Sequence, residues 1–128
     1  MLYNHDGRAR LYRIVYYCNA RGDSPVEEFL DTLDRKAFIK VAAFIQYLAE
    51  QGPNLHRPYS DHVRGFLREL RIGSGGNSVR VLYCFMTGSK IVLLHGFLKK
   101  DQALRASDIE LAENRMRDWK SRIGVESK

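Results

Sequence analysis

Seven basic side chains lie between residues 64 and 100, a stretch in which Glu69 is the single acidic residue. The residues before and after this stretch carry equal numbers of acidic and basic side chains, so the net charge of +6 belongs to the middle of the chain. Clustered guanidinium and ammonium groups are typical of surfaces that bind a phosphate backbone. The distribution indicates a polyanion-binding surface, with RNA the first candidate, although it would also suit a solvated face that only keeps the protein soluble.

Two arginines and the single glutamate of this stretch lie inside apolar, strand-like segments. Side chains alternate across a strand, so Glu69 and Arg71 share one face of residues 66–72, FLRELRI. Arg80 lies in the middle of residues 78–86, SVRVLYCFM. A guanidinium in such a segment requires a paired carboxylate or an anionic ligand. An ion pair of Arg80 with Glu69 is compatible with a phosphate site, because one carboxylate cannot neutralise two arginines.

The third strand-like segment, residues 90–98, runs into a pair of lysines. We expect Lys99 or Lys100 to meet Arg71 and Arg80 in a common concave patch, although solvated lysines at a strand end are ordinary. The remaining candidates for contact with RNA are three cations and four rings that could stack on a base or pack in the core: Arg64, Arg68, Lys90, Tyr83, Tyr59, His56 and Phe66.

Glu69 and His95 are competing candidates for a general base. Simple alternation places His95 on the same strand face as Ile91, Leu93 and Phe97. A histidine in this setting is more commonly a hydrogen-bonded core residue than a catalyst. Both interpretations stay open at this point.

Several classes of protein are disfavoured by what the sequence lacks. It has no HExxH or CxxC motif, no ligand spacing among its four histidines and no phosphate-binding glycine loop, so we expect neither a metal nor a cofactor. Cys18 and Cys84 lie in apolar segments and are predicted to be inert core thiols. No apolar run approaches the ~18 residues of a membrane span, and no signal peptide is apparent, so we expect a cytoplasmic protein without membrane contacts.

The length of 128 residues suits a single domain spanning residues 1–128, with an ordered core at about 11–122. The pattern predicts an α+β fold with an N-terminal strand, a helical hairpin, an antiparallel three-stranded meander and a C-terminal helix. Ser24 and Asp34 are the predicted helix caps of the hairpin, and Ser107 that of the last helix. The expected segments are a strand at 11–18, helices from 24 and from 34 to 52, a surface loop at 53–65, strands at 66–72, 78–86 and 90–98, and a helix at 107–122.

The segment from Gly65 to Ala112 resembles the RelE/ParE superfamily of toxins, and within it the phage-derived HigB-like branch of type II toxin–antitoxin systems. Three motifs carry the resemblance: Glu69-Leu70-Arg71, the pair Arg80 and Tyr83, and Leu93-Leu94-His95-Gly96-Phe97-Leu98-Lys99-Lys100. The order of elements before these motifs agrees with this branch as well. The resemblance implies the β-α-α-β-β-β-α order of a RelE-like fold.

The resemblance also implies a function. RelE-like and HigB-like members act as ribosome-dependent mRNA endonucleases, in which a 2′-hydroxyl attacks the adjacent phosphate without a metal. The expected partners are then mRNA, the ribosome and a cognate antitoxin, which we expect to be of the helix-turn-helix type. Two alternatives stay open, namely a ParE-like toxin that inhibits DNA gyrase and a non-catalytic RNA-binding module.

Overall fold

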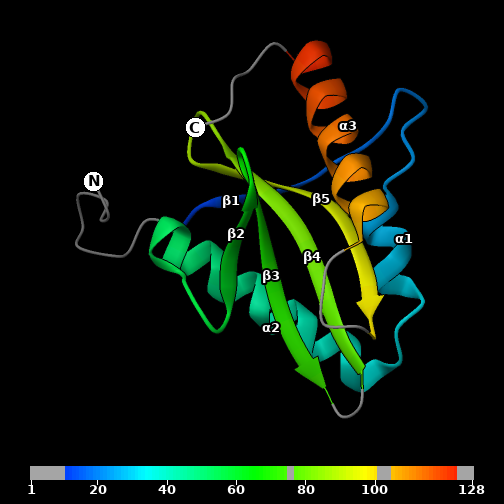
Figure 1. Cartoon of the computed structure of the whole chain (residues 1–128), viewed down its shortest axis with the longest axis vertical. Helices are drawn as coiled ribbons and strands as arrows, with labels where there is room; N and C mark the ends of the chain where they lie inside the picture. Colours follow the sequence, from blue (N-terminus) through cyan, green and yellow to red (C-terminus); the bar gives the residue numbers. More distant parts are fainter. Residues whose placement is uncertain (1–10, 75–76, 101–104, 124–128) are drawn as a thin grey trace.

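The computed structural model describes residues 11–74, 77–100 and 105–123. One sheet forms its centre, with helices on both faces (Figure 1). The elements in chain order are β1 (Arg13–Tyr16), α1 (Pro25–Asp31), α2 (Arg35–Gln51), a short 3-10 turn (Gly52–Asn54), β2 (Ser60–Arg64), β3 (Leu67–Ser74), β4 (Asn77–Met86), β5 (Lys90–Lys99) and α3 (Ala106–Ile123).

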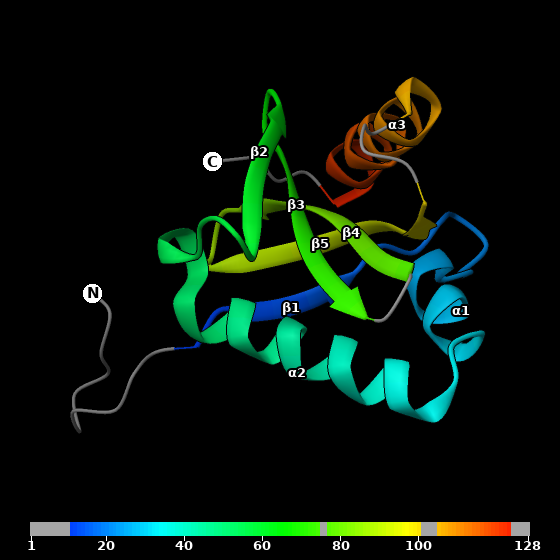
Figure 2. The same ribbon diagram turned by 60° about the horizontal axis from the view of Figure 1, so that its bottom comes forward.

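The sheet has five strands in the spatial order β1-β5-β4-β3-β2. Strands β2 to β5 form an antiparallel meander, whereas β1 pairs parallel to β5 at the other edge. Helix α2 runs along one face of the sheet and α3 stands against the opposite face (Figures 1 and 2). The predicted α+β architecture is confirmed.

The face toward α1 and α2 is closed by an apolar core. Buried side chains alternate along the strands and meet the apolar stripe of the helical hairpin. The capping carboxylate of Asp34 accepts a hydrogen bond of 2.8 Å from the backbone N–H of Ala37, which fixes the start of α2. The buried side chains of this core include Val26, Val41, Leu48, Leu70, Ile72, Val81, Tyr83 and Leu93.

The opposite face is divided into two halves. Near α3 it is apolar, and Leu82, Cys84 and Leu94 are buried against the helix together with Ala112 and Met116. Beyond the reach of α3, the same face carries charged side chains instead. We call these the covered half and the open half of this face.

Three expectations about local structure were wrong. Residues 60–64 form strand β2 and not a surface loop, because their backbone pairs with β3 as the edge of the sheet. The meander therefore has four strands. Ser24 precedes α1 as predicted but makes no side-chain capping bond, and Ser107 lies inside α3, which begins at Ala106. Among the described residues, no helix is long and apolar enough to cross a membrane.

Candidate functional site

The open half is organised around one buried carboxylate. Arg71 and Arg80 are cross-strand partners on β3 and β4, and Glu69 lies on the same face. The Nε atom of Arg71 donates to Oε1 of Glu69 at 2.7 Å, and Nε of Arg80 lies 3.6 Å from Oε2 of Glu69. Both arginines therefore interact with the same glutamate, and the ion pair of Arg80 with Glu69, which the sequence left open, is present.

This pairing leaves positive charge and hydrogen-bonding capacity unsatisfied. Within the described part of the chain, neither Oε2 of Glu69 nor Nε of Arg80 has a hydrogen-bond partner, although both are buried. The side chains of Glu69 and Arg80 are only 5% and 14% exposed, whereas that of Arg71 is 36% exposed. Burial lowers the pKa of Arg80, partly offset by Glu69, as expected for a cation removed from water. Arg57, Arg71 and Arg80 together face two carboxylates, those of Glu69 and Asp61, and this excess of one positive charge favours the approach of an anion.

A hollow of about 260 Å³ opens in front of this cluster. Arg71 and Glu69 reach it from β3, and Lys99 reaches it from the end of β5. Arg80 on β4 is not among the residues that line the hollow, and its ion pair with Glu69 links it to them. The lining residues are Asp61, His62, Val63, Glu69, Arg71, Lys99 and Ile109. Arg71 and Lys99 thus line one hollow, whereas Arg80, which we expected to join them there, is linked to it only through its ion pair with Glu69.

Asp61 belongs to the hollow and was not predicted. Asp61 on β2 lies opposite Glu69 on β3 in the strand register, so its side chain lies on the same face of the sheet as that of Glu69. Its Oδ2 accepts from Nε of Arg57 at 2.9 Å and lies 3.4 Å from Nη2 of Arg71. The hydrogen bond from Arg57 is the main reason that the pKa of Asp61 is lowered. Asp61 was missed because its segment was taken for a loop, and the alternation of its short edge strand is weak.

His95 does not lie on the predicted face. A β-bulge shifts the register of β4 and β5, so that Tyr83 faces Leu93 but Leu82 faces His95. The extra residue turns His95 away from Ile91 and Leu93 and onto the face that α3 covers. Its predicted neighbour Phe97 follows it there, and the two rings stack with centroids 4.9 Å apart.

The imidazole of His95 is engaged at both nitrogens. Its Nε2 lies 2.8 Å from Oδ1 of Asp108 on α3, and its Nδ1 lies 3.5 Å from Nη1 of Arg115. Burial is the main cause of its lowered pKa, which favours the neutral ring. A neutral ring that donates through Nε2 and accepts at Nδ1 satisfies both contacts. His95 therefore joins β5 to α3, and it does not line the hollow.

Tyr83 cannot stack on a base in this structure, which corrects the prediction. It lies on the face opposite Arg80, where α2 covers the sheet, and its side chain is fully buried. Its hydroxyl forms a hydrogen bond of 2.6 Å with Oγ of Ser60. Alternation along β4 explains the outcome, because the arginine and the tyrosine of this motif are an odd number of positions apart.

The other predicted cations lie outside the hollow. Arg64 forms a two-pronged ion pair with Glu113 of α3, at 2.6 and 3.1 Å. Arg68 points to the opposite face of β3, and Lys90 begins β5 at the end far from Lys99. Lys100 follows β5 and is exposed. These four residues therefore lie near the cluster in the sequence but do not line its hollow.

Two further predictions concern cysteine and metal chemistry. Cys84 is buried, and burial raises its pKa to about 12, which makes it an unreactive thiol. Cys18 is half-buried and not in a core. In the described ranges, no group of three or more His, Cys, Asp or Glu side chains is arranged to hold a metal ion.

Comparison with known proteins gives a consistent result. Residues 28–117 match the family described as phage-derived protein Gp49-like. Over 118 residues, the chain is 33% identical to a Mycobacterium tuberculosis protein named "Putative toxin HigB2", covering 80% of this chain and 59% of that protein. It is also 33% identical over 100 residues to "Putative toxin HigB3" of the same organism, covering 73% of this chain and 86% of that protein. The chain thus spans less than two thirds of the first of these relatives and most of the second.

Proposed function

Because the chain belongs to the phage-derived Gp49-like family and is similar to proteins named "Putative toxin HigB2" and "Putative toxin HigB3", we propose that it is the toxin of a type II toxin–antitoxin system and cuts mRNA. A cognate antitoxin is then its protein partner, and translated mRNA on the ribosome is its substrate. The observation that carries the proposal is the pair Arg71 and Arg80, held on one carboxylate in front of a hollow that Lys99 also lines.

The cluster suits the charge that develops during RNA cleavage. When a 2′-hydroxyl attacks the adjacent phosphate, the P–O5′ bond breaks, and negative charge grows on the non-bridging oxygens and on the leaving oxygen. Arg71 and Lys99 reach the hollow from two strands and would contact these oxygens. Arg80 would add its charge from behind, where burial makes it more effective than a solvated cation.

Glu69 is better placed than His95 to accept the proton of the attacking hydroxyl. It lines the hollow, and its Oε2 has no hydrogen-bond partner among the described residues. His95 uses both ring nitrogens for contacts with α3. A phosphate that draws Arg71 toward itself would uncover the carboxylate of Glu69. In this proposal, Lys99 stabilises charge.

The proposal is tested by replacing Arg80. Arg80→Ala should abolish the growth arrest caused by overproduction, while circular dichroism shows a folded protein. Cleavage sites on mRNA should be mapped by primer extension with and without ribosomes. As a control of equal charge change, Arg21→Ala removes an 84% exposed arginine in a loop and should leave toxicity intact. Full toxicity of Arg80→Ala would contradict the assignment.

The same assays separate the two alternatives. DNA breaks with intact mRNA would indicate a gyrase inhibitor, which the proposal does not predict. A protein that only binds RNA should lose affinity gradually as Arg71, Arg80 and Lys99 are removed one at a time. An enzyme should instead lose cleavage by orders of magnitude with the first arginine.

A further inference from the structure

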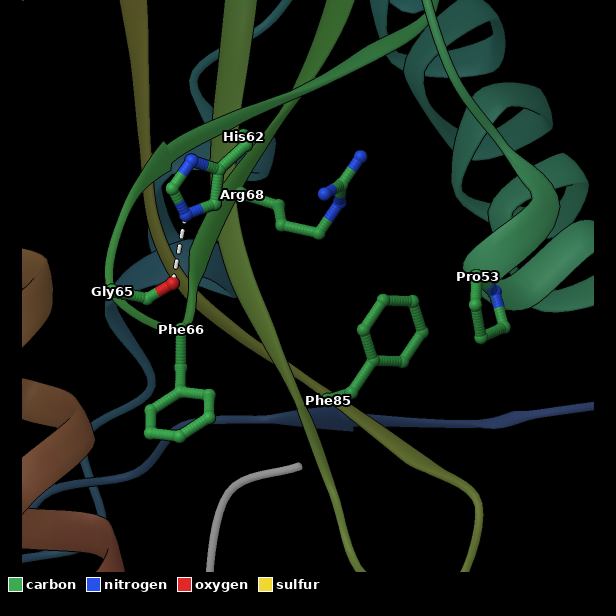
Figure 3. A pocket seen from close by; sticks show the side chains of 6 residues that line it. All are labelled: Pro53, His62, Gly65, Phe66, Arg68 and Phe85. Atoms are coloured by element: carbon green, nitrogen blue, oxygen red, sulfur yellow. Dashed lines mark hydrogen bonds between the residues drawn. The ribbon is translucent and has the colours of Figure 1, made fainter.

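A second hollow, of about 230 Å³, lies on the other side of β2 and β3. It is lined by Pro53, His62, Gly65, Phe66, Arg68 and Phe85 (Figure 3). None of these residues contributes to the Arg71–Glu69–Arg80 cluster. His62 is common to the two hollows, which therefore lie on opposite sides of the same edge strand.

Arg68 is an unpaired cation in this hollow. Its side chain is half-buried, and within the described part of the chain it forms no hydrogen bond or ion pair. Other arginines of the β2–β3 hairpin are paired, Arg64 with Glu113 and Arg71 with Glu69. Figure 3 shows the guanidinium of Arg68 extending across the hollow toward Pro53 and above the ring of Phe85. A guanidinium that lines a hollow without a paired carboxylate can bind a phosphate group.

Two aromatic rings supply the other part of a nucleotide-binding surface. Phe85 is held by edge-to-face contacts with Tyr12 and Tyr83, at 5.8 and 5.7 Å between centroids, so its ring is pre-organised. Phe66, at the tip of the hairpin, is 48% exposed. The Nζ atom of Lys120 on α3 lies 5.3 Å from the centroid of the Phe66 ring, which is therefore within reach of a second cation.

The turn that carries Phe66 is itself held in place. The Nε2–H of His62 donates to the backbone oxygen of Gly65 at 2.8 Å (Figure 3). Gly65 has a φ of +56°, a conformation that favours glycine, and it sets the direction of the hairpin tip. Exposed aromatic rings on a fixed turn beside a cation are typical of surfaces that stack single-stranded bases.

We propose that this second hollow binds one nucleotide of the RNA outside the cleavage site, with its base stacked on Phe66 or Phe85 and its phosphate on Arg68. This inference rests on the proposed function, because it assumes that the strand crosses the β2 edge from the Arg71 hollow. The volume is below the roughly 300–1,000 Å³ of pockets for drug-sized ligands, which suits a single base. Binding of this nucleotide would fix the position of the substrate strand relative to the Arg71 hollow.

The test measures binding without cleavage. The probe is a fluorescent 2′-O-methyl oligoribonucleotide, which lacks the attacking hydroxyl, and its affinity for the full chain is measured by anisotropy at fixed salt. Arg68→Gln and Phe66→Ala should each weaken binding by about tenfold, since stacking and phosphate contacts are of that size. Arg21→Gln removes the same charge at a distant exposed site and should change affinity by less than about twofold.

A second measurement locates the binding site. A nucleoside 5′-monophosphate, which has no bond to cut, should shift the amide resonances of Gly65 and Phe66 in the wild type and not in Arg68→Gln. Equal affinity of Arg68→Gln, Phe66→Ala and Arg21→Gln for the oligonucleotide would overturn the proposal. So would shifts produced only by an acidic peptide, which would assign the hollow to a protein partner.

The outcomes also separate this inference from the proposed function. If the wild type cuts RNA but the Arg68 and Phe66 variants bind as the control does, the second site is wrong and the proposed function stands. If the wild type cuts no RNA with or without ribosomes, yet these variants still lose affinity, the proposed function is wrong and the nucleotide site stands.

Discussion

The covered and open halves of the α3-facing sheet surface lie on the same strands, but one carries buried apolar side chains and the other charged ones. On β4, Leu82 and Cys84 are buried against α3, whereas Arg80, two positions before Leu82 on the same face, faces Glu69 and Arg71. On β5, Leu94 belongs to the covered half and Lys99 to the open half. The face changes from apolar to charged where its contact with α3 ends. The hydrogen-bonded pair of His95 and Asp108 lies at that boundary.

The difference shows how a small domain can hold a charged site without losing its core. The opposite face is apolar where α1 and α2 cover it, so these helices hold the sheet from that side, although Arg68 also lies on this face. The open half is therefore free to hold side chains that make little contribution to stability. Substitutions in the two halves should accordingly affect different properties.

The largest expected effect is on activity and comes from the open half. Arg71→Ala removes a cation that lines the hollow, so RNA cleavage should fall by about 100- to 1,000-fold. The substitution also leaves the buried carboxylate of Glu69 without its hydrogen bond of 2.7 Å, so the free energy of unfolding should fall by about 1–3 kcal/mol in urea titrations. Cleavage is therefore compared per folded molecule. A variant that still cleaves at the wild-type rate would contradict the division between the halves.

In the covered half, Leu82→Ala should reduce stability instead. Leu82 is fully buried, so the cavity should lower the free energy of unfolding by about 2–5 kcal/mol in urea titrations. Cleavage per folded molecule, measured well below the unfolding transition, should stay near the wild-type value. A selective loss of cleavage would show that the two halves are coupled through β4.

A smaller loss of stability is expected behind the open half. A Cβ atom added at Gly96 would lie 2.6 Å from Cδ2 of Phe29 on α1, too close for van der Waals contact. Gly96→Ala should therefore lower the free energy of unfolding by about 1–3 kcal/mol. Gly73→Ala is the control, because a Cβ there would meet nothing within 4 Å.

The smallest effect concerns pH and the boundary between the halves. The pKa of His95 is lowered mainly by burial, so it lies below the unfolded value of ~6.5. As the pH falls, the unfolded chain therefore binds a proton at His95 before the folded chain does. The contribution of His95 to the free energy of unfolding is complete above pH ~6.5 and is lost as the pH falls through the folded pKa.

Replacing His95 should therefore flatten the dependence of stability on pH. His95→Gln should reduce the slope of the free energy of unfolding between about pH 5 and pH 6.5, as measured by urea titrations at each pH. An unaltered slope in His95→Gln would show that another group causes the acid sensitivity.

Local patterns in the sequence predicted most of the fold. The apolar periodicity and the Asp34 cap located α2, and alternation with short turns located β3, β4 and β5. Strand β2 was missed because its polar residues carry little local signal and its structure comes from pairing with β3. Edge strands of this kind depend on tertiary contacts that a local pattern does not contain.

The site was predictable where it depends on alternation and not where it depends on register. Glu69, Arg71 and Arg80 were brought to one face correctly because each strand keeps its period of two up to that point. The bulge between β4 and β5 changed the face of His95, and nothing in its residue types indicated the extra position. The contacts of His95 with α3 and of Asp61 with Arg57 likewise depend on how elements pack together.

The parallel pairing of β1 with β5 bears on how the protein is made. Residues 60–99 form a meander of neighbouring strands, which can assemble soon after they leave the ribosome. Strand β1 is synthesised much earlier. It cannot pair until β5 is made, because Arg13 lies opposite Lys90 in the parallel register. The nascent chain therefore carries an unpaired strand through most of its synthesis, and the sheet is completed only when its last strand emerges.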